Sequence, residues 1–283
     1  MSEHETTRAL DERAHQQAEQ ASARAALGTH RAAYASMAAA QRGNARGIGI
    51  AAVVLGLLTL WAVLGGYPVL AAVPGLPFLM CLLGLASSRS SADRNQGARL
   101  DLFERGLTVA TPDRSWAVRY AEATVLQHLV RHTQYGRTLR TTYAYLLTDT
   151  EGRSVVLRDG FGGRMDALAL ATMPKPELAR DFAGAPEWGP AIQRAVTEAR
   201  LPEALDRVRA GEKVQFGPLW LTRSEIGARE KAVPWTEVED VQVKDGVVSI
   251  RVAGRWSSLA TATVSTIPNF FVFQELAARL LAA

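Results

Sequence analysis

Residues 47–88 read GIGIAAVVLGLLTLWAVLGGYPVLAAVPGLPFLMCLLGLASS, a run of 42 consecutive residues with no Asp, Glu, Lys, Arg or His. A helix that crosses the hydrocarbon layer of a membrane needs about 20 apolar residues, so this run is long enough for two crossings. We predict one helix at about 47–65 and a second at about 67–86. The sequence Gly65-Gly66-Tyr67-Pro68 has the composition of a tight turn, and Pro68 suits the first position of the second helix.

The charges on either side of this run indicate how it crosses the membrane. Arg42 and Arg46 precede it, and Arg89, Arg94 and Arg99 follow it. Cytoplasmic flanks of membrane helices are enriched in Lys and Arg, whereas the turn between the two helices carries no charge. We therefore predict a multi-pass protein of the cell membrane with both termini in the cytoplasm.

Other interpretations of residues 47–88 fit less well. A cleavable signal peptide would lie nearer residue 1, and a water-soluble helical pair would need a polar face that this run does not offer. Pro74 and Pro77 each remove a helix hydrogen bond, so we expect a kink in the second helix. A second segment that enters and leaves on the same side of the membrane is the main alternative. Cys81 then lies in lipid or at the helix contact, where a thiol behaves as a small hydrophobe.

Composition excludes several classes of protein. The chain has 283 residues and a formal charge of +4, from 32 Lys and Arg against 28 Asp and Glu. Nucleic-acid readers usually concentrate basic residues on one face, and the near balance argues against a nucleic-acid partner. A single cysteine excludes a disulfide framework and a multi-cysteine metal site, and no motif indicates a cofactor.

Residues on either side of the apolar run form the remaining parts of the chain. Residues 1–46 are rich in Ala, Gln, Arg and Glu, with too few large apolar side chains for a core, so we expect a helical or disordered cytoplasmic tail. After the run, alternating β-type segments and Gly-containing turns are followed by helical patterns at 186–200, 202–210 and 268–281. We predict an α+β protein in which two tandem units, 99–211 and 212–283, follow the membrane hairpin.

The two units contain short stretches that resemble each other. Tyr120 and Glu122 correspond to Trp235 and Glu237, each pair 115 residues apart. Upstream, Phe103 and Leu107 correspond to Phe216 and Trp220, and downstream Gly152-Arg153 corresponds to Gly254-Arg255. Two copies with loops of different length would produce such a shifting separation, so the pattern indicates an internal repeat.

The run Val233-Pro234-Trp235-Thr236-Glu237-Val238, within a β-rich stretch that ends in one helix, resembles bacterial pleckstrin-homology-like (PH-like) domains. Residues 187–196, 252–256 and 267–273 resemble an uncharacterised actinobacterial membrane-protein family over about residues 100–283. The resemblance implies units made of a curved antiparallel sheet or barrel closed by a C-terminal helix, and it carries over no functional residues. In the PH-like class the first loop between strands is often basic. Here that loop is Thr111-Pro112-Asp113-Arg114-Ser115, with one arginine offset by one aspartate, which argues against phosphoinositide binding.

Two groups of residues are candidates for binding surfaces. Arg131, His132, Arg137 and Arg140 surround a predicted hairpin tip with Tyr135 at its centre, and such a tip could contact anionic lipid. The alternative is an ordinary charged hairpin that keeps a sheet edge soluble. A second candidate, for a partner surface, depends on exposure of the three tryptophans that lie on the strands and turns of the second unit. These are Trp220, Trp235 and Trp256, and we expect tryptophans on alternating strands to face the core.

Catalytic and metal-binding patterns have ordinary structural explanations. His128 and His132 fall on a predicted strand, where side chains four residues apart lie about 13 Å from each other, too far to share one ion. The stretch 159–164 (DGFGGR) lacks the residues of a phosphate-binding loop and is expected to be a flexible turn. The carboxylates of Glu237 and Glu239 are typical of the solvated face of a strand. We therefore do not expect an enzyme.

Three functions are compatible with these features of the sequence. The favoured one is a membrane-anchored cytoplasmic interaction module that binds a protein partner or the inner leaflet. The second is a sensing or regulatory component, in which substitutions at Pro74 or Pro77 would alter the distal units. The third, an enzyme with an unrecognised site, has the least support.

Overall fold

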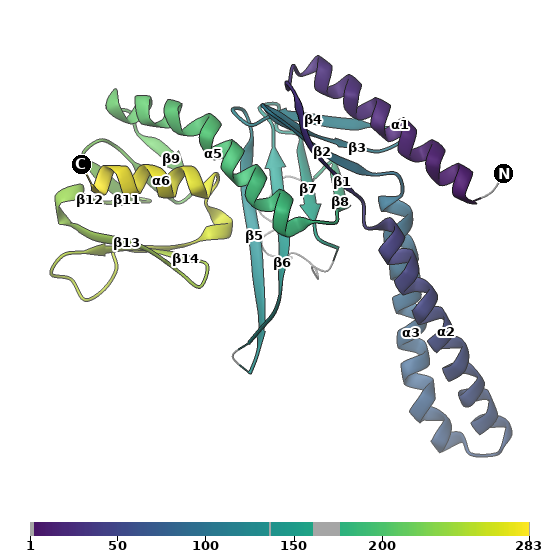
Figure 1. The fold of residues 1–283 in the computed structure, drawn as a ribbon. Coiled ribbons are helices and arrows are strands. Elements are labelled where there is room, and N and C mark those ends of the chain that lie inside the picture. The colour runs from purple at the N-terminus through teal and green to yellow at the C-terminus, as the bar shows by residue number, and fades with distance from the viewer. Residues whose placement is uncertain (1–2, 136, 161–175, 283) are drawn as a thin grey trace.

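The computed structural model describes residues 3–135, 137–160 and 176–282, and within these it is a mixed α+β structure (Figure 1). Sheets occupy one side of the molecule, and a pair of long antiparallel helices projects away from them. The helices are α1 (Glu3–Arg24), α2 (Ala38–Leu64), α3 (Pro68–Asn95), α5 (Ala185–Arg209) and α6 (Phe270–Leu281), with 3-10 turns η1 (Trp235–Glu237) and η2 (Val264–Thr266).

The first sheet is antiparallel and has the strand order β1-β2-β3-β4. Its strands are β1 (His30–Ala35), β2 (Arg99–Phe103), β3 (Gly106–Ala110) and β4 (Ser115–Arg119). Helices α2 and α3 lie between β1 and β2 in the chain. The apolar helical pair therefore connects two neighbouring strands of this sheet and does not simply precede the sheet. Because β1 pairs with β2 over Tyr34↔Leu100 and neighbouring positions, it completes the sheet.

Residues 1–46 therefore differ from the expected tail. Helix α1 packs on the first sheet, and its small side chains Ala14 and Ala18 are buried against Ala110. Alanines suffice for this contact because they let the helix backbone approach the sheet closely, which is why the segment needs few large apolar residues. Residues 3–24 form a helix, and residues 30–35 form a strand that the alternating Ala and Tyr of HRAAYA did not reveal.

Helices α2 and α3 contain the uncharged run and extend beyond it at both ends. Helix α2 begins at Ala38, before the predicted start at 47, and helix α3 ends at Asn95, after the predicted end at 86. The turn lies where the sequence places it, and Gly66 has a φ of +78°, a conformation that glycine adopts without strain. Helix α3 continues through Pro74 and Pro77, so the second segment is one helix and not a re-entrant loop.

By length and composition, the described chain has two helices able to cross a membrane, and their apolar windows are almost entirely unburied. Large side chains such as Leu57, Trp61 and Leu83 are more than half exposed. A helical pair that is apolar all round and uncovered by protein would be unstable in water, because its apolar surface has nothing to bury against. The structure thus supports membrane association of this pair.

The second sheet has the order β5-β6-β7-β8. Its strands are β5 (Thr124–Gln134), β6 (Arg137–Thr148), β7 (Ser154–Arg158) and β8 (Leu178–Asp181); β8 runs parallel to β7 and the other pairs are antiparallel. Sheets one and two, together called the first sheet pair, enclose a core that includes Leu107, Tyr145 and Trp188. Tyr145 and Trp188 meet edge to face, with ring centroids 5.4 Å apart.

The second sheet pair is smaller. One sheet has the order β12-β11-β10-β9 and the other β13-β14-β15, and all neighbouring strands are antiparallel. The strands are β9 (Val214–Phe216), β10 (Leu219–Leu221), β11 (Glu225–Ala228), β12 (Lys231–Pro234), β13 (Val238–Lys244), β14 (Val247–Val252) and β15 (Ala260–Thr263). Helix α6 lies in their core through Phe273 and Leu276, and Phe273 meets Phe216 edge to face.

Helix α5 is shared by the two sheet pairs. The sequence predicted two helices separated near Pro202, but α5 is continuous through Pro190 and Pro202. Its first part buries Trp188, Ile192 and Val196 in the first core, and its last part buries Leu201, Ala204 and Val208 in the second. The expected boundary at 211/212 therefore does not separate two independent bodies, because one helix belongs to both cores.

A second contact joins the sheet pairs near the start of β5. The Asn269 side-chain carbonyl accepts a hydrogen bond from the Val125 backbone N–H at 2.8 Å, and the Asn269 N–H donates to the Val125 carbonyl at 2.8 Å. Arg200 of α5 donates to the Ala123 carbonyl at 2.8 Å. These bonds and the shared helix fix the second sheet pair against the first.

Candidate functional site

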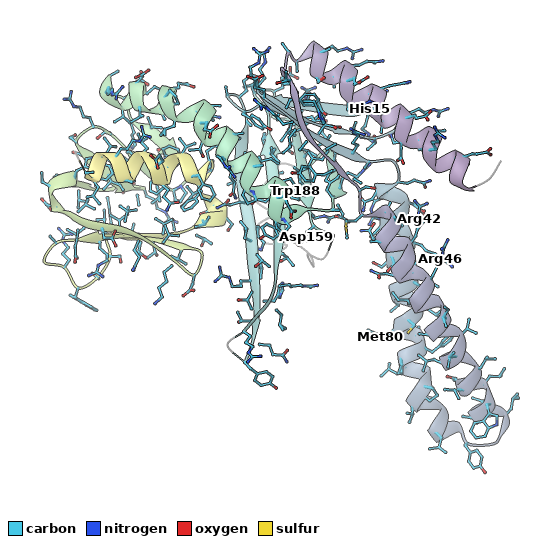
Figure 2. The ribbon with its side chains drawn as sticks, viewed as in Figure 1. His15, Arg42, Arg46, Met80, Asp159 and Trp188 are labelled. Carbon is cyan, nitrogen blue, oxygen red and sulfur yellow. The ribbon has the colours of Figure 1, made fainter. Side chains whose placement is uncertain are left out.

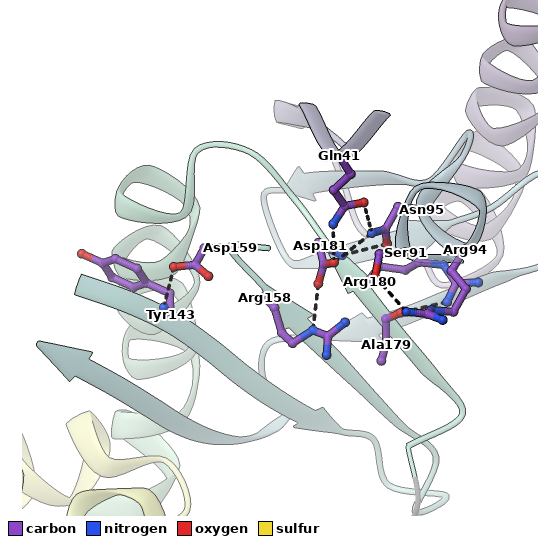
Figure 3. Close-up of polar contacts among 10 residues, drawn as sticks. All are labelled: Gln41, Ser91, Arg94, Asn95, Tyr143, Arg158, Asp159, Ala179, Arg180 and Asp181. Atoms are coloured by element: carbon purple, nitrogen blue, oxygen red, sulfur yellow. Dashed lines mark hydrogen bonds and ion pairs between the residues drawn. The ribbon is translucent and has the colours of Figure 1, made fainter. Parts of the chain in front are cut away.

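A buried polar cluster joins the helical pair to the second sheet (Figure 3). We call it the root clamp and define it as Gln41 of α2, Asn95 of α3, Arg158 of β7 and Asp181 of β8. Asp181 is at its centre: one carboxylate oxygen accepts from Arg158 Nε at 2.8 Å, and the other accepts from Gln41 Nε2 at 2.8 Å and Asn95 Nδ2 at 2.9 Å. Asn95 also donates to Gln41 Oε1 and accepts from the Asp181 N–H.

Burial makes this cluster energetically important. Asp181 and Asn95 are only 4% and 2% exposed, while the Arg158 side chain keeps 31% of its surface in solvent. A buried carboxylate is costly unless it is paired and hydrogen-bonded, and here its two oxygens accept three bonds. The cluster therefore holds the bases of both helices only while all four side chains stay in place.

Backbone bonds support the root clamp. The Met37 N–H donates to the Asp181 carbonyl at 2.9 Å, and Ala183 N–H donates to the Ala35 carbonyl at 3.0 Å. Ser36 and Phe182 form a β-bridge between these bonds. The chain passing from β1 into α2 is thus paired with the end of β8, so a rotation of α2 at its base would strain the second sheet directly.

Arg180, next to the clamp, has charged neighbours of both signs. It is partly buried, its Nη1 donates to the Ala179 carbonyl at 2.8 Å, and its Nε has no hydrogen-bond partner among the described residues. Burial, followed by the charge of nearby Arg114, lowers the pKa of Arg180. Asp113 acts in the opposite direction.

The predicted hairpin tip lies at the end of a long two-stranded ribbon. Strands β5 and β6 pair from Thr124↔Thr148 to Gln134↔Arg137, whereas β7 covers β6 only from Ala144 to Thr148. The outer part of the ribbon is therefore flanked by no other strand among the described residues. Tyr135 at the tip is 96% exposed and Leu139 is 65% exposed.

The structure brings the basic residues predicted for this tip together. Arg131, His132, Arg137 and Arg140 all lie on its paired strands, and His132↔Arg140 is one of the cross-strand pairs. The sequence has no Asp or Glu between Glu122 and Asp149, so the ribbon itself contributes no carboxylate near them. Contact of this tip with lipid remains a prediction.

The three tryptophans of the second candidate surface do not lie together on the outside. Trp220 and Trp235 are buried, as expected for strand and turn residues facing a core, and their indole N–H groups donate to the carbonyls of Arg229 and Thr222 at 3.1 Å. Lys213 Nζ lies 4.0 Å from the Trp220 ring centroid. Trp256 was also expected to face the core, but it lies in the loop between β14 and β15 and is fully exposed. The condition for a joint tryptophan surface is not met.

The remaining sequence candidates have structural partners. His128 and His132 lie on β5 as predicted, and the described residues contain no group of three or more His, Cys, Asp or Glu that could hold a metal. In the predicted turn at 159–164, the Asp159 side chain accepts a hydrogen bond from the Tyr143 N–H at 3.0 Å and so extends the pairing of β6 with β7. Residues 161–164 lie outside the described part of the chain. Glu239 is exposed and pairs with Arg251 at 3.3 Å.

The root clamp was not predicted from the sequence. Gln41, Asn95 and Asp181 carry no motif: Gln41 lies in the expected tail, Asn95 lies in the flank of the apolar run, and Asp181 lies shortly before the helix predicted from residue 186. A short polar residue at the base of each apolar helix is the only local signal, and it does not identify its partner.

Comparison with known proteins gives one match. The family described as a family of unknown function (DUF6585) matches residues 172–282, which include β8, α5 and the second sheet pair. This result agrees with the expected resemblance to an uncharacterised family. No curated protein and no solved structure matches the chain.

Proposed function

We propose that the protein is a membrane-anchored interaction module of the cell membrane. Helices α2 and α3 cross the membrane as a hairpin, both termini lie in the cytoplasm, and the two sheet pairs are PH-like units held close to the inner leaflet. In this proposal the tip of the β5–β6 ribbon contacts anionic lipid headgroups, while the rest of the sheets is free to receive a protein partner. No enzymatic activity is proposed.

The order of the strands supports the assignment of two PH-like copies. Each sheet pair consists of a four-stranded antiparallel meander, a second sheet that begins with a three-stranded meander, and then a helix that enters the core. Tyr120 and Trp235 correspond in this arrangement, because each directly follows the fourth strand and is buried. Gly152 and Gly254 also correspond, since each lies between the second and third strands of the second meander.

The same correspondence corrects two of the sequence-based interpretations. Phe103 ends a second strand and Phe216 ends a first strand, so the upstream pairing was shifted by one strand. The loop 111–115 connects β3 to β4 and is not the first loop. The connection between the first two strands is the helical pair itself.

The observation that carries the proposal is the direction and charge of the β5–β6 ribbon. In Figure 1 the ribbon and the helical pair project to the same side of the sheets, and both extend beyond the rest of the fold. A basic tip with an exposed tyrosine is therefore directed toward the surface from which the helices enter. Each basic residue near an anionic surface contributes about 1 kcal/mol, so three arginines contribute about 3 kcal/mol, or roughly a 100-fold change in occupancy of the surface.

The experiment uses the full chain reconstituted in vesicles, because removing residues before 99 would delete β1. In a Cys81→Ala background, a spin label at Tyr135→Cys reports whether the tip is shielded from a water-soluble relaxation agent. We expect shielding in phosphatidylcholine–phosphatidylglycerol vesicles, reversed by high salt and by the triple variant R131Q/R137Q/R140Q. The charge-matched control R194Q/R223Q/R255Q changes three arginines elsewhere and should retain shielding. Equal accessibility of the label in neutral and anionic vesicles would refute the lipid contact.

A sensing role is the second candidate, and the root clamp favours it. The root clamp transmits a rotation of the helices to β8 more directly than a flexible linker could, because Asp181 is hydrogen-bonded to both helices and to β7. This candidate predicts that replacing Asp181 changes hydrogen exchange on both sides of the joint.

A further inference from the structure

A groove runs along one side of the helical pair and has a volume of about 1170 Å³. Its walls are apolar and come from both helices, with Ile50, Val53, Leu57 and Leu60 on α2 and Leu82 and Leu85 on α3. The end of the groove nearest the sheets is different, because Arg42, Arg46 and Arg89 line it. Figure 2 shows Arg42 and Arg46 on the part of α2 closest to the sheets.

Among the described residues, these arginines have no partner that explains their position. Within the part of the chain that the structure describes, none of the three forms an ion pair or a side-chain hydrogen bond. Asp93 is the one carboxylate among the described residues that line the groove, so three positive charges face one negative charge. Guanidinium groups bind phosphate through paired hydrogen bonds, and the groove end therefore has the chemistry of a phosphate site.

The position of the arginines along the helices matches the headgroup layer. At 1.5 Å per residue, the uncharged part of α2 from residue 47 to residue 64 is about 27 Å long, close to the hydrocarbon thickness of a bilayer. Arg46 and Arg89 flank the uncharged run directly, and Arg42 lies one turn further out. The polar layer on each side of the hydrocarbon is about 5–7 Å deep, so all three side chains reach it.

We propose that this groove binds one anionic phospholipid of the cytoplasmic leaflet. The headgroup phosphate lies between Arg42, Arg46 and Arg89, and an acyl chain extends along the apolar walls toward Leu57 and Leu60. The inference rests on the proposed insertion of α2 and α3 into the membrane, but it is independent of the β5–β6 tip.

A second copy of this chain fits the groove less well than a lipid. A parallel copy in the same membrane would bring its own Arg42, Arg46 and Arg89 to the same depth, where six arginines would face only two aspartates. The arginines of the two copies would repel one another, whereas an anionic headgroup neutralises their positive charge.

The test is native mass spectrometry of the full chain released from nanodiscs that contain equal parts of phosphatidylcholine and phosphatidylglycerol. We expect one phosphatidylglycerol per retained complex, with at least about a tenfold preference over phosphatidylcholine. The variant R42Q/R46Q/R89Q should lose the preference, and R42K/R46K/R89K should keep most of it because the positive charges remain. R194Q/R223Q/R255Q is the charge-matched control and should behave as the native protein.

A second pair of variants locates the lipid in the groove. Val53→Trp fills the apolar channel without touching the arginines and should reduce retained phosphatidylglycerol, whereas Leu58→Trp, outside the groove lining, should not. Equal retention of the two lipids, retention that survives the glutamine variant, or a dimer without bound lipid would each overturn the proposal. Resistance of the full chain to alkaline extraction from membranes is measured in parallel. Extraction of the chain would refute the anchoring itself, whereas a resistant chain without selective lipid would refute only the groove site.

Discussion

Replacement of Asp181 by asparagine tests how firmly the helical pair is held to the sheets. The native carboxylate accepts bonds from Arg158, Gln41 and Asn95 at 2.8, 2.8 and 2.9 Å. An asparagine has nearly the same shape, but it is neutral and presents an NH2 group in place of one oxygen. Either Arg158 or the pair of amides then faces a donor instead of an acceptor.

The expected loss of stability in Asp181→Asn follows from the burial of the root clamp. Removing one partner of a buried ion pair costs about 3–5 kcal/mol, because the other charge is left without compensation. Arg158 keeps 31% of its side chain in solvent, so partial hydration places the cost at the low end, about 3 kcal/mol. This corresponds to roughly a 100-fold increase in the population in which the hydrogen bonds of the root clamp are broken.

Hydrogen exchange of the full chain in nanodiscs measures this opening. The amides of Met37 and Gln41 bond to the Asp181 and Met37 carbonyls, and we expect them to exchange roughly 100-fold faster in Asp181→Asn. Amides of β14, far from the joint, should be unaffected. Asp245→Asn is the matched control, since Asp245 lies in an exposed turn with a φ of 50° that asparagine tolerates. Native exchange at residues 37–41, or equal acceleration throughout the chain, would show that the clamp does not act as described.

Two further predictions concern the sheet pairs. Leu201→Ala, on the part of α5 that belongs to the second core, should lower the free energy of unfolding by about 2–3 kcal/mol. We expect faster hydrogen exchange in β14 and unchanged protection in β7. An equal loss of protection in both strands would mean that the shared helix does not divide its contacts between the two cores. Burial raises the pKa of Tyr120 above its ordinary value, so the folded state holds this proton more tightly than the unfolded chain. Stability is then constant below about pH 10 and falls as the pH rises above it, by up to about 1.4 kcal/mol per pH unit for each such tyrosine. Because burial raises the pKa of Tyr34 and Tyr145 as well, Tyr120→Phe should reduce this slope in urea unfolding without abolishing it, and an unchanged slope would contradict the assignment.

Local patterns in the sequence determined the elements whose physical cause is local. The uncharged run at 47–88 predicted two apolar helices and the turn at Gly66, because a helix satisfies its backbone hydrogen bonds within one segment of the chain. Alternation and turn residues likewise predicted the ribbon around Tyr135, since a tip with a positive-φ residue follows from short-range geometry. Exposure of Tyr135 and the absence of carboxylates nearby in the sequence also follow from residues close together in the chain.

The tertiary structure decided what depends on distant partners. β1 is a strand because β2, which follows it only after the whole helical pair, offers it an edge; its own sequence has no strong strand signal. Helix α5 stays continuous through Pro202 because both cores hold it, so packing outweighs the lost hydrogen bond. Gln41, Asn95 and Asp181 become one site only because three segments far apart in sequence meet at a buried point. A polar residue's partner is set by the fold and not by its neighbours in the sequence. For this reason the sequence predicted where the apolar helical pair lies but not how that pair is joined to the sheets.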